Sequence, residues 1–194
     1  MTQPNFTIRP ARREEAAHIA SLIMTAMNDE CCQYFAGPEH TLEDFHKLIT
    51  SLVERTDSQY SYLNALVAAD PENNVVGVLV GYDGARLHEL RRAFVDACKE
   101  AFDRDFSNIP DETQAGEFYL DSLAVEERMR GHGVASALLR AAIEKHGKQQ
   151  PVGLLVDKGN PKAEALYLRL GFVYQNDNEW GGHPMKHLVA RAKN

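Results

Sequence analysis

The sequence has few cysteines, no long apolar run and no excess of basic residues. Its three cysteines, with Cys31 and Cys32 adjacent, match neither a disulfide framework nor the paired spacing of a zinc ribbon, so we expect reduced thiols. No apolar run approaches the ~20 residues that cross a membrane, and the N-terminus lacks a signal-peptide pattern. We therefore expect a cytoplasmic protein that does not enter a membrane.

The charge balance also limits the partners. Lys and Arg number 21 against 28 Asp and Glu, which gives a formal net charge of −7. A sequence-independent nucleic-acid binder needs a basic surface, so we expect no nucleic acid, and an acidic protein suits a cationic partner. With 194 residues and 44% hydrophobic content, the chain can bury one core, which predicts a single domain over residues 1–194.

Hydrophobic periodicity predicts alternating strands and helices. Period-two patterns and compact apolar runs predict strands at 6–9, 60–69, 75–82, 117–125, 152–156, 172–174 and 185–190. Apolar residues three and four positions apart predict helices at 13–27, from Thr41 to about 52, at 85–106, between the glycine turn near 131 and Gly147, and at 161–170. Thr41 and Asp44, three residues apart, predict a cap for the second helix, and residues 70–74 predict a hairpin turn between the strands at 60–69 and 75–82. Residues 28–40 lose this periodicity, and we expect a loop there.

Residues 117–135 combine an apolar strand, a basic turn with two glycines and the start of a helix. Gly131 and Gly133 allow the main chain to curl so that amide N–H groups point inward, and the helix adds its own free N–H groups. Arg128 and Arg130 can pair with a diphosphate. This pattern predicts a phosphate site.

Other interpretations of the glycine turn have to be weighed. An isolated Gly-x-Gly is more often a plain turn than a ligand site. A Rossmann dinucleotide fingerprint would use Asp157 for the ribose, but its third glycine would fall on Ser136 and too little chain follows for a second nucleotide half. Position therefore disfavours the Rossmann interpretation.

Two motifs occur in the same order and spacing as in a known family. Residues 128–135 read Arg-Met-Arg-Gly-His-Gly-Val-Ala, and residues 160–172 read Asn-Pro-Lys-Ala-Glu-Ala-Leu-Tyr-Leu-Arg-Leu-Gly-Phe. Together they resemble the acyl-CoA-dependent N-acetyltransferases of the GNAT superfamily. The close resemblance covers residues 117–174. It implies an α/β (α+β) fold with a mixed, mostly antiparallel central sheet flanked by helices.

The resemblance also implies a cofactor and the residues that bind it. Acetyl-CoA would donate its acetyl group directly to the primary amine of an unidentified small-molecule or peptide acceptor, leaving CoA as the product. The strands at 117–125 and 152–156 would splay apart so that pantetheine lies between them, with a backbone N–H near Leu123 polarising the thioester carbonyl. The implied cofactor-binding residues are Leu123, Ala124, Val125, Arg128, Arg130, Gly131, His132, Gly133, Val134, Ala135, Asn160 and Tyr167. Asn160 can serve equally as a helix cap.

Catalytic and acceptor residues are predicted with more alternatives. The resemblance places the Tyr167 hydroxyl beside the departing sulfur as a proton donor, although the side chain can also simply pack the helix on the sheet. Asp121 lies nearest the implied thioester, and it can be the base, an acceptor-binding anion or a structural carboxylate. The candidate acceptor-binding residues are Asp29, Glu30, Tyr34, Tyr119 and Asp121.

The chain departs from the family plan at residues 83–115, where an extra helix is inserted before the central strand. Its apolar stripe must be covered by the domain itself, by closure over the substrate, or by a second subunit in a homodimer. Arg86, Arg91 and Arg92 alternate with acidic residues, and we expect a solvated face there. His183 and His187 have metal-ligand spacing only on a helix, and the sequence there favours a strand. A non-catalytic acyl-CoA-binding module with the same fold is the alternative function.

Overall fold

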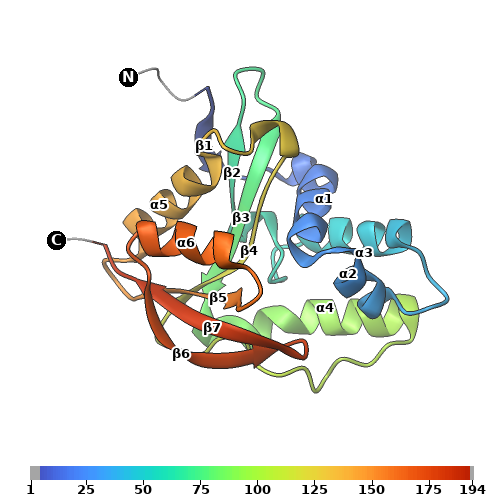
Figure 1. Cartoon of the computed structure of the whole chain (residues 1–194). Coiled ribbons are helices and arrows are strands. Elements are labelled where there is room, and N and C mark those ends of the chain that lie inside the picture. Colours follow the sequence, from blue (N-terminus) through green and yellow to red (C-terminus); the bar gives the residue numbers. More distant parts are fainter. Residues whose placement is uncertain (1–4, 193–194) are drawn as a thin grey trace.

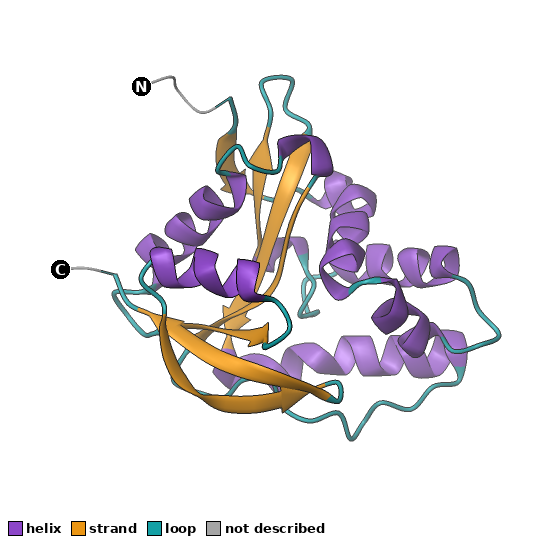
Figure 2. Ribbon diagram, viewed as in Figure 1, coloured by secondary structure: helices purple, strands orange, loops and turns teal. Residues whose placement is uncertain are grey.

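A computed structural model of the protein describes residues 5–192 and contains one seven-stranded sheet with helices on both faces (Figures 1 and 2). The strand order is β1-β2-β3-β4-β5-β7-β6; β4 and β5 pair in parallel, and the other neighbouring strands of the described chain pair antiparallel. The strands are β1 Thr7–Pro10, β2 Ala65–Ala69, β3 Val75–Asp83, β4 Phe118–Val125, β5 Val152–Asp157, β6 Val173–Trp180 and β7 His183–Ala190. The mixed, mostly antiparallel sheet flanked by helices is confirmed.

The helices divide between the two faces of the sheet (Figure 1). They are α1 Ala16–Met27, α2 Asp29–Ala36, α3 Leu42–Glu54, α4 Leu87–Phe102, α5 Val134–His146 and α6 Pro161–Arg169. Helices α1, α2, α3 and α4 share one apolar core with one face of the sheet. Helices α5 and α6 share a second apolar core with the opposite face. No helix within residues 5–192 is long and apolar enough to span a membrane.

Local sequence signals explain several element boundaries. Thr41 accepts a hydrogen bond from the Asp44 backbone N–H, and the Asp44 carboxylate accepts one from the Thr41 N–H, which forms the predicted capping box of α3. The turn between β2 and β3 closes where Asp70 accepts from the Asn74 N–H at 2.8 Å and Asn73 takes a φ of 66°. Both features follow from short polar side chains that bond to the nearby backbone.

The loop expected at residues 28–40 is wrong in part, because α2 occupies Asp29–Ala36. Asn28 caps this helix by accepting from the Cys31 N–H at 2.9 Å, and Cys32, Phe35 and Ala36 are buried. Eight residues give too few repeats for a clear helical period. The helix is held mainly by its tertiary contacts, since helices of this length are marginal alone.

Two strand boundaries also differ from the prediction. Residues 62–64 form a 3-10 turn capped by Ser61, so β2 begins at Ala65 rather than at 60. The strand predicted at 172–174 extends to Trp180 as β6, an edge strand whose side chains are mostly exposed. An exposed edge strand lacks the apolar alternation by which strands are recognised.

The inserted segment packs on the domain. α4 ends at Phe102, four residues earlier than predicted, because Asp103 takes a left-handed conformation with a φ of 52°. Phe94 lies edge-on to Phe35 and Tyr60, with ring centroids 5.0 and 5.8 Å away. The apolar stripe is therefore covered by the core beneath α2 and α3.

The expectation that the arginines of this helix form a solvated face is wrong at Arg91. Arg91 is buried and forms ion pairs with Asp111 at 3.2 Å and with Glu112. Arg92 is exposed, as expected. The difference arises because the chain after α4 folds back and places two carboxylates beside Arg91, a long-range contact that helical periodicity does not reveal.

Candidate active site

The parallel pair β4 and β5 separates partway along its length. The two strands pair at Phe118 with Val152, Tyr119 with Gly153 and Leu120 with Leu154, and no further pair between them is formed by the described residues. Beyond these pairs, β4 continues to Val125 on β3 alone and β5 continues to Asp157 on β7 alone. Beyond Leu120 and Leu154, the edge of each strand that faces the other is therefore not covered by it. The family resemblance implied such a separation.

The glycine turn lies directly after β4. Glu127–Met129 form a 3-10 turn, and Gly131 and Gly133 take left-handed φ values of 80° and 85°. A Cβ added at either glycine would meet nothing within 4 Å, so the backbone conformation and not the available space requires glycine here. The predicted curl of the main chain is therefore present.

This turn leaves several backbone donors free. α5 begins with Gly133 at its N-cap, a residue that has no side chain to cap the helix. Among residues 5–192, no acceptor is found for the backbone N–H groups of Gly131, Gly133, Val134, Ala135 and Ser136. These free N–H groups and the helix dipole make the turn a site for a phosphate or another anion.

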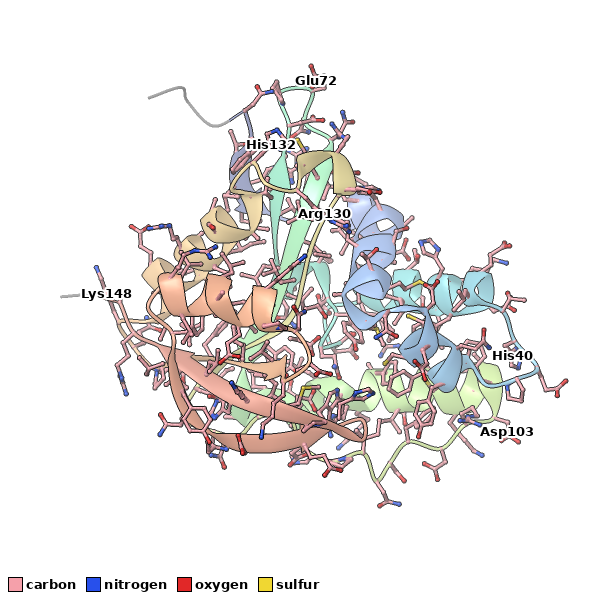
Figure 3. The ribbon with its side chains drawn as sticks, in the orientation of Figure 1. His40, Glu72, Asp103, Arg130, His132 and Lys148 are labelled. Atoms are coloured by element: carbon pink, nitrogen blue, oxygen red, sulfur yellow. The ribbon has the colours of Figure 1, made fainter. Side chains whose placement is uncertain are left out.

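The two arginines of the turn differ in their partners. Arg128 pairs with Glu126 at 2.7 Å and with Asp70 at 3.2 Å, which ties the turn to the β2–β3 hairpin. Arg130 is exposed and approaches only the Val125 carbonyl, at 3.4 Å, within the described chain. Figure 3 shows Arg130 and His132 on this turn, and the His132 ring lies 3.0 Å from the Arg130 carbonyl. Arg130 is the guanidinium left available for an anion.

Asn160 and Tyr167 are both carried by the segment around α6. The Asn160 Oδ1 accepts from the Ala163 N–H at 3.1 Å and so caps α6, while its amide nitrogen has no acceptor within residues 5–192. Tyr167 is partly buried, packs edge-on to Phe172 at 5.7 Å, and its hydroxyl also has no described partner. Burial raises the pKa of Tyr167 to about 12, so the phenol carries its proton at neutral pH.

Asp121 occupies a β-bulge. The register with β3 jumps between Val80 opposite Ser122 and Gly81 opposite Leu120, so Asp121 has no partner strand residue. Its carboxylate accepts from the Ser122 hydroxyl at 2.7 Å, from the Tyr82 hydroxyl at 3.1 Å and from the Gln59 side-chain amide at 3.2 Å. Burial raises the pKa of Asp121 despite these hydrogen bonds.

A second carboxylate, which the sequence did not indicate, lies beside the first. Glu112 is buried, contacts the Tyr82 hydroxyl at 3.2 Å and pairs with Arg91. Burial and the neighbouring charge of Asp121 raise the pKa of Glu112 to about 7, against the opposing effect of Arg91. Nothing in the local sequence pattern could have found Glu112, because it lies in an irregular segment and its partners are distant in the chain.

Tyr119 of β4 and Glu117, just before that strand, are buried in separate contacts. Tyr119 is 5% exposed and packs edge-on to Tyr82 at 5.9 Å, beside the two carboxylates. Glu117 accepts from the Thr113 hydroxyl at 2.6 Å and lies 2.7 Å from His187 Nε2. Glu117 is therefore a paired structural carboxylate and is not joined to the Asp121 contacts.

The acceptor residues predicted on 28–40 lie on α2. Asp29 and Glu30 are exposed in its first turn. Tyr34 is 61% exposed, and the Arg104 guanidinium lies 5.6 Å from its ring. No hydrogen bond or ion pair between described residues joins these three side chains to Asp121, so the structure does not bring the predicted acceptor set into one contact network.

The remaining candidates have structural environments. Cys31, Cys32 and Cys98 are free thiols, and burial raises the pKa of Cys32 and of Cys98 to about 12, which disfavours the reactive thiolate. His183 lies in β7, as expected, with its Nδ1 3.4 Å from Asp157. Neither set forms a catalytic arrangement.

Comparison with known proteins agrees with this geometry. The model of the acetyltransferase (GNAT) family matches residues 23–172. The chain belongs to this family. Acetyltransferase Atu2258 from Agrobacterium fabrum, for example, is 32% identical over 112 residues, covering 57% of this chain and 82% of that protein.

Solved acetyltransferase structures have the same fold over most of the chain. One crystal structure of an acetyltransferase is 29% identical, with a TM-score of 0.79, over 96% of this chain and 100% of that one. The spermidine N-acetyltransferase from Vibrio cholerae, in complex with CoA and spermine, has a TM-score of 0.57 and 16% identity over 96% of this chain and 95% of that one. The second likeness shows the fold alone. These comparisons support a GNAT acetyltransferase and give no support to the non-catalytic alternative.

Proposed function

We propose that the protein transfers the acetyl group of acetyl-CoA directly to the primary amine of a small cationic acceptor. The observation that carries the proposal is the set of free backbone N–H groups at residues 131–136, which follow the stretch of β4 that β5 does not cover. Acyl-CoA has a diphosphate for the first feature and a pantetheine arm with amide groups for the second. The residues present therefore fit this cofactor.

The chain would bind the cofactor mainly through its backbone. The free N–H groups of the glycine turn would hold the diphosphate, with Arg130 adding the charge that backbone donors lack. The uncovered edge of β4 at Leu123, Ala124 and Val125 would pair with the pantetheine amides, because backbone groups in a dry contact need partners. The free amide nitrogen of Asn160 would donate to the same arm.

Two side chains would move protons in the reaction. Acetyl-CoA supplies a thioester, whose carbonyl carbon receives the amine lone pair and whose sulfur departs with the electron pair of the broken bond. Tyr167 would donate its proton to that sulfur, because its raised pKa keeps the phenol protonated at neutral pH. Asp121 would take the proton of the acceptor ammonium, which must be lost before the nitrogen can attack.

The acceptor class rests on charge. Asp121 supplies an anion at the site, Tyr119 lies beside it, and Asp29, Glu30 and Tyr34 would line the approach from α2. The net charge of −7 would raise the encounter rate of a cation. The Vibrio cholerae enzyme, solved with spermine, acts on an amine of this class, although the two proteins share the fold alone.

An assay of thiol release over a panel of amines tests the function. The panel should contain spermidine, an aminoglycoside, free amino acids and a peptide N-terminus, with acetyl-CoA as the donor. We expect release of CoA that depends on at least one cationic amine and equals the acetylated amine formed, measured by mass spectrometry. Release at the amine-free rate with every amine, despite tight CoA binding, would favour a binding module over an enzyme.

A further inference from the structure

A buried group of polar side chains lies beneath the bulge of β4, and the proposed reaction uses only one of them. We call Asp121, Glu112, Tyr82 and Gln59 the carboxylate cluster. These residues come from four separate segments, and Tyr82 and Gln59 are 2% and 4% exposed. Two carboxylates in one buried place require an explanation, because isolated buried charge is costly.

The hydroxyl of Tyr82 lies between the two carboxylates. Its oxygen is 3.1 Å from Asp121 Oδ2 and 3.2 Å from Glu112 Oε1. A phenol has one proton, so it can donate fully to only one of these acceptors. Both contacts become hydrogen bonds when one carboxyl group is protonated and donates to the phenol oxygen. The geometry therefore favours one extra proton within the cluster.

Charge balance gives the same result. Arg91 is the cation that pairs with Glu112, and it also bonds Asp111 and the Ile109 carbonyl. Asp121 has no ion-pair partner within residues 5–192. Two carboxylates that share one site cannot both ionise freely, because each charge raises the pKa of the other. The rise in the pKa of Glu112 to about 7 agrees with this arrangement.

The cluster has one accessible member and an open acceptor. Asp121 is partly exposed, whereas Glu112 and Tyr82 are buried. Within residues 5–192, Gln59 Oε1 is the one buried side-chain polar atom without a hydrogen-bond partner. Its orientation is fixed because the amide nitrogen of the same side chain donates to Asp121. An N–H donor that reaches Asp121 would find this oxygen beside it.

We propose that Asp121 and Glu112 act as one proton-sharing pair, bridged by the Tyr82 hydroxyl, that takes up the proton released by the acceptor ammonium. This inference rests on the proposed function. An N–H bond of the ammonium breaks and an O–H bond forms on Asp121. In the form with both carboxylates ionised, Tyr82 then gives its proton to Glu112 and receives that of Asp121, with no change in electron count. Asp121 is the catalytic residue, and Glu112 is a positioning residue that works through it.

The proposal gives the inserted segment a role in the reaction. Arg91 on α4 and Glu112 after it both belong to residues 83–115, and Trp180 of β6 lies over the Arg91 guanidinium at 5.7 Å. The segment therefore supplies the second carboxylate and the cation that holds it. The titratable and charged groups that act on the pair are Tyr60, Tyr82, Arg91 and Tyr119, and Asp111 pairs with Arg91.

A direct titration tests the pair without relying on turnover. Carbon-13 NMR of labelled carboxyl groups, assigned through Glu112→Gln and Asp121→Asn, should show Glu112 titrating near pH 7. In Asp121→Asn, the midpoint of Glu112 should fall by about one pH unit or more, because a like charge is removed. A Glu112 midpoint that does not move in folded Asp121→Asn, or one at the ordinary value of 4.5, would overturn the pair.

The pH profile of kcat/KM, measured with the fastest amine of the panel, supplies the functional test. Activity should fall as the pH drops through the apparent pKa of the pair. In Glu112→Gln this limb should move to lower pH by about one unit, since loss of the Glu112 charge lowers the pKa of Asp121. Glu100→Gln, an exposed substitution on α4, should keep the wild-type profile. A purely structural role would lower activity equally at every pH and leave the limb in place.

The two proposals fail in different ways. CoA affinity, measured by calorimetry, should be native in Glu112→Gln, because the cluster lies outside the predicted cofactor contacts. If acetylated amine forms but the Glu112 midpoint does not move in folded Asp121→Asn, the proton-sharing pair is overturned and the acetyltransferase proposal stands. If the Glu112 midpoint does fall in Asp121→Asn but no amine of the panel is acetylated, acetyl transfer is overturned, and with it the role of the pair in proton uptake.

Discussion

Tyr167 and the glycines of the 131–133 turn carry the proposed chemistry at the scale of single residues. The Tyr167 hydroxyl has no hydrogen-bond partner among residues 5–192, and the ring packs on Phe172, so a substitution can remove the hydroxyl and leave the ring contact in place. The turn needs glycine for its left-handed φ and not for space, because a Cβ at Gly131 or Gly133 would meet no neighbour within 4 Å. A substitution can therefore remove one property at a time.

Tyr167→Phe should lower kcat by roughly 100-fold while CoA affinity stays native. The change removes the proton donor and retains the ring, and general acid catalysis contributes factors of this size. Steady-state kinetics at saturating acceptor, together with calorimetry for CoA, measures the two effects. An unchanged kcat would mean that Tyr167 does not protonate the thiolate in the slow step.

Gly131→Val should weaken CoA binding by about tenfold or more. A β-branched residue cannot hold the left-handed φ of 80°, so the free N–H groups would turn away from the diphosphate. Gly182→Val is the matched control, because Gly182 has a φ of 78° and equal free space but lies between β6 and β7. Native CoA affinity in a folded Gly131→Val protein would remove the turn from the cofactor site.

At the scale of elements, sequence patterns predicted the structures that are held by interactions between residues close together in the chain. The α3 capping box and the hairpin turn at Asp70 are made within a few residues, and both were found as expected. The short helix α2 and the edge strand β6 were missed, because neither shows a sustained period. Their stability comes from neighbours that no local window contains.

The same distinction separates the predicted from the unpredicted parts of the site. The glycine turn is a backbone conformation, and two glycines before a helix are enough to predict it. The carboxylate cluster needs the bulge at Asp121 and the return of the chain after α4, which bring distant segments together. The family resemblance covers the first and not the second.

Phe94→Ala should destabilise the domain by about 3–5 kcal/mol, because α4 buries its apolar stripe in the core shared by α1, α2 and α3. Arg92→Ala on the exposed side of α4 is the matched control and should change the free energy of unfolding by less than about 0.5 kcal/mol. Denaturant unfolding measures both. If both substitutions change the free energy of unfolding by equally small amounts, α4 is not packed as described. Closure over the substrate would then be the better explanation of its apolar stripe.

At the scale of the whole molecule, the two faces of the sheet are assigned different tasks. The glycine turn leads into α5, and Asn160 caps α6 and Tyr167 belongs to it on the same face, whereas the carboxylate cluster lies beside Leu87 and Leu90 of α4. Figure 1 shows α5 and α6 on the other side of the sheet from α1 and α3. The uncovered edges of β4 and β5 lie between them. Cofactor and acceptor would therefore approach the separation of the strands from opposite faces, and the acetyl group would cross between them.

The most direct test of this arrangement is a map of backbone amide shifts as CoA is added to the nitrogen-15-labelled protein. The account predicts the largest shifts at the free N–H groups of Gly131, Gly133, Val134, Ala135 and Ser136, followed by residues 121–125 of β4. Amides of α3, remote from the site, serve as the internal control. Saturable binding of CoA with its shifts concentrated elsewhere, and with the 131–136 amides unmoved, would contradict the proposed acyl-CoA site.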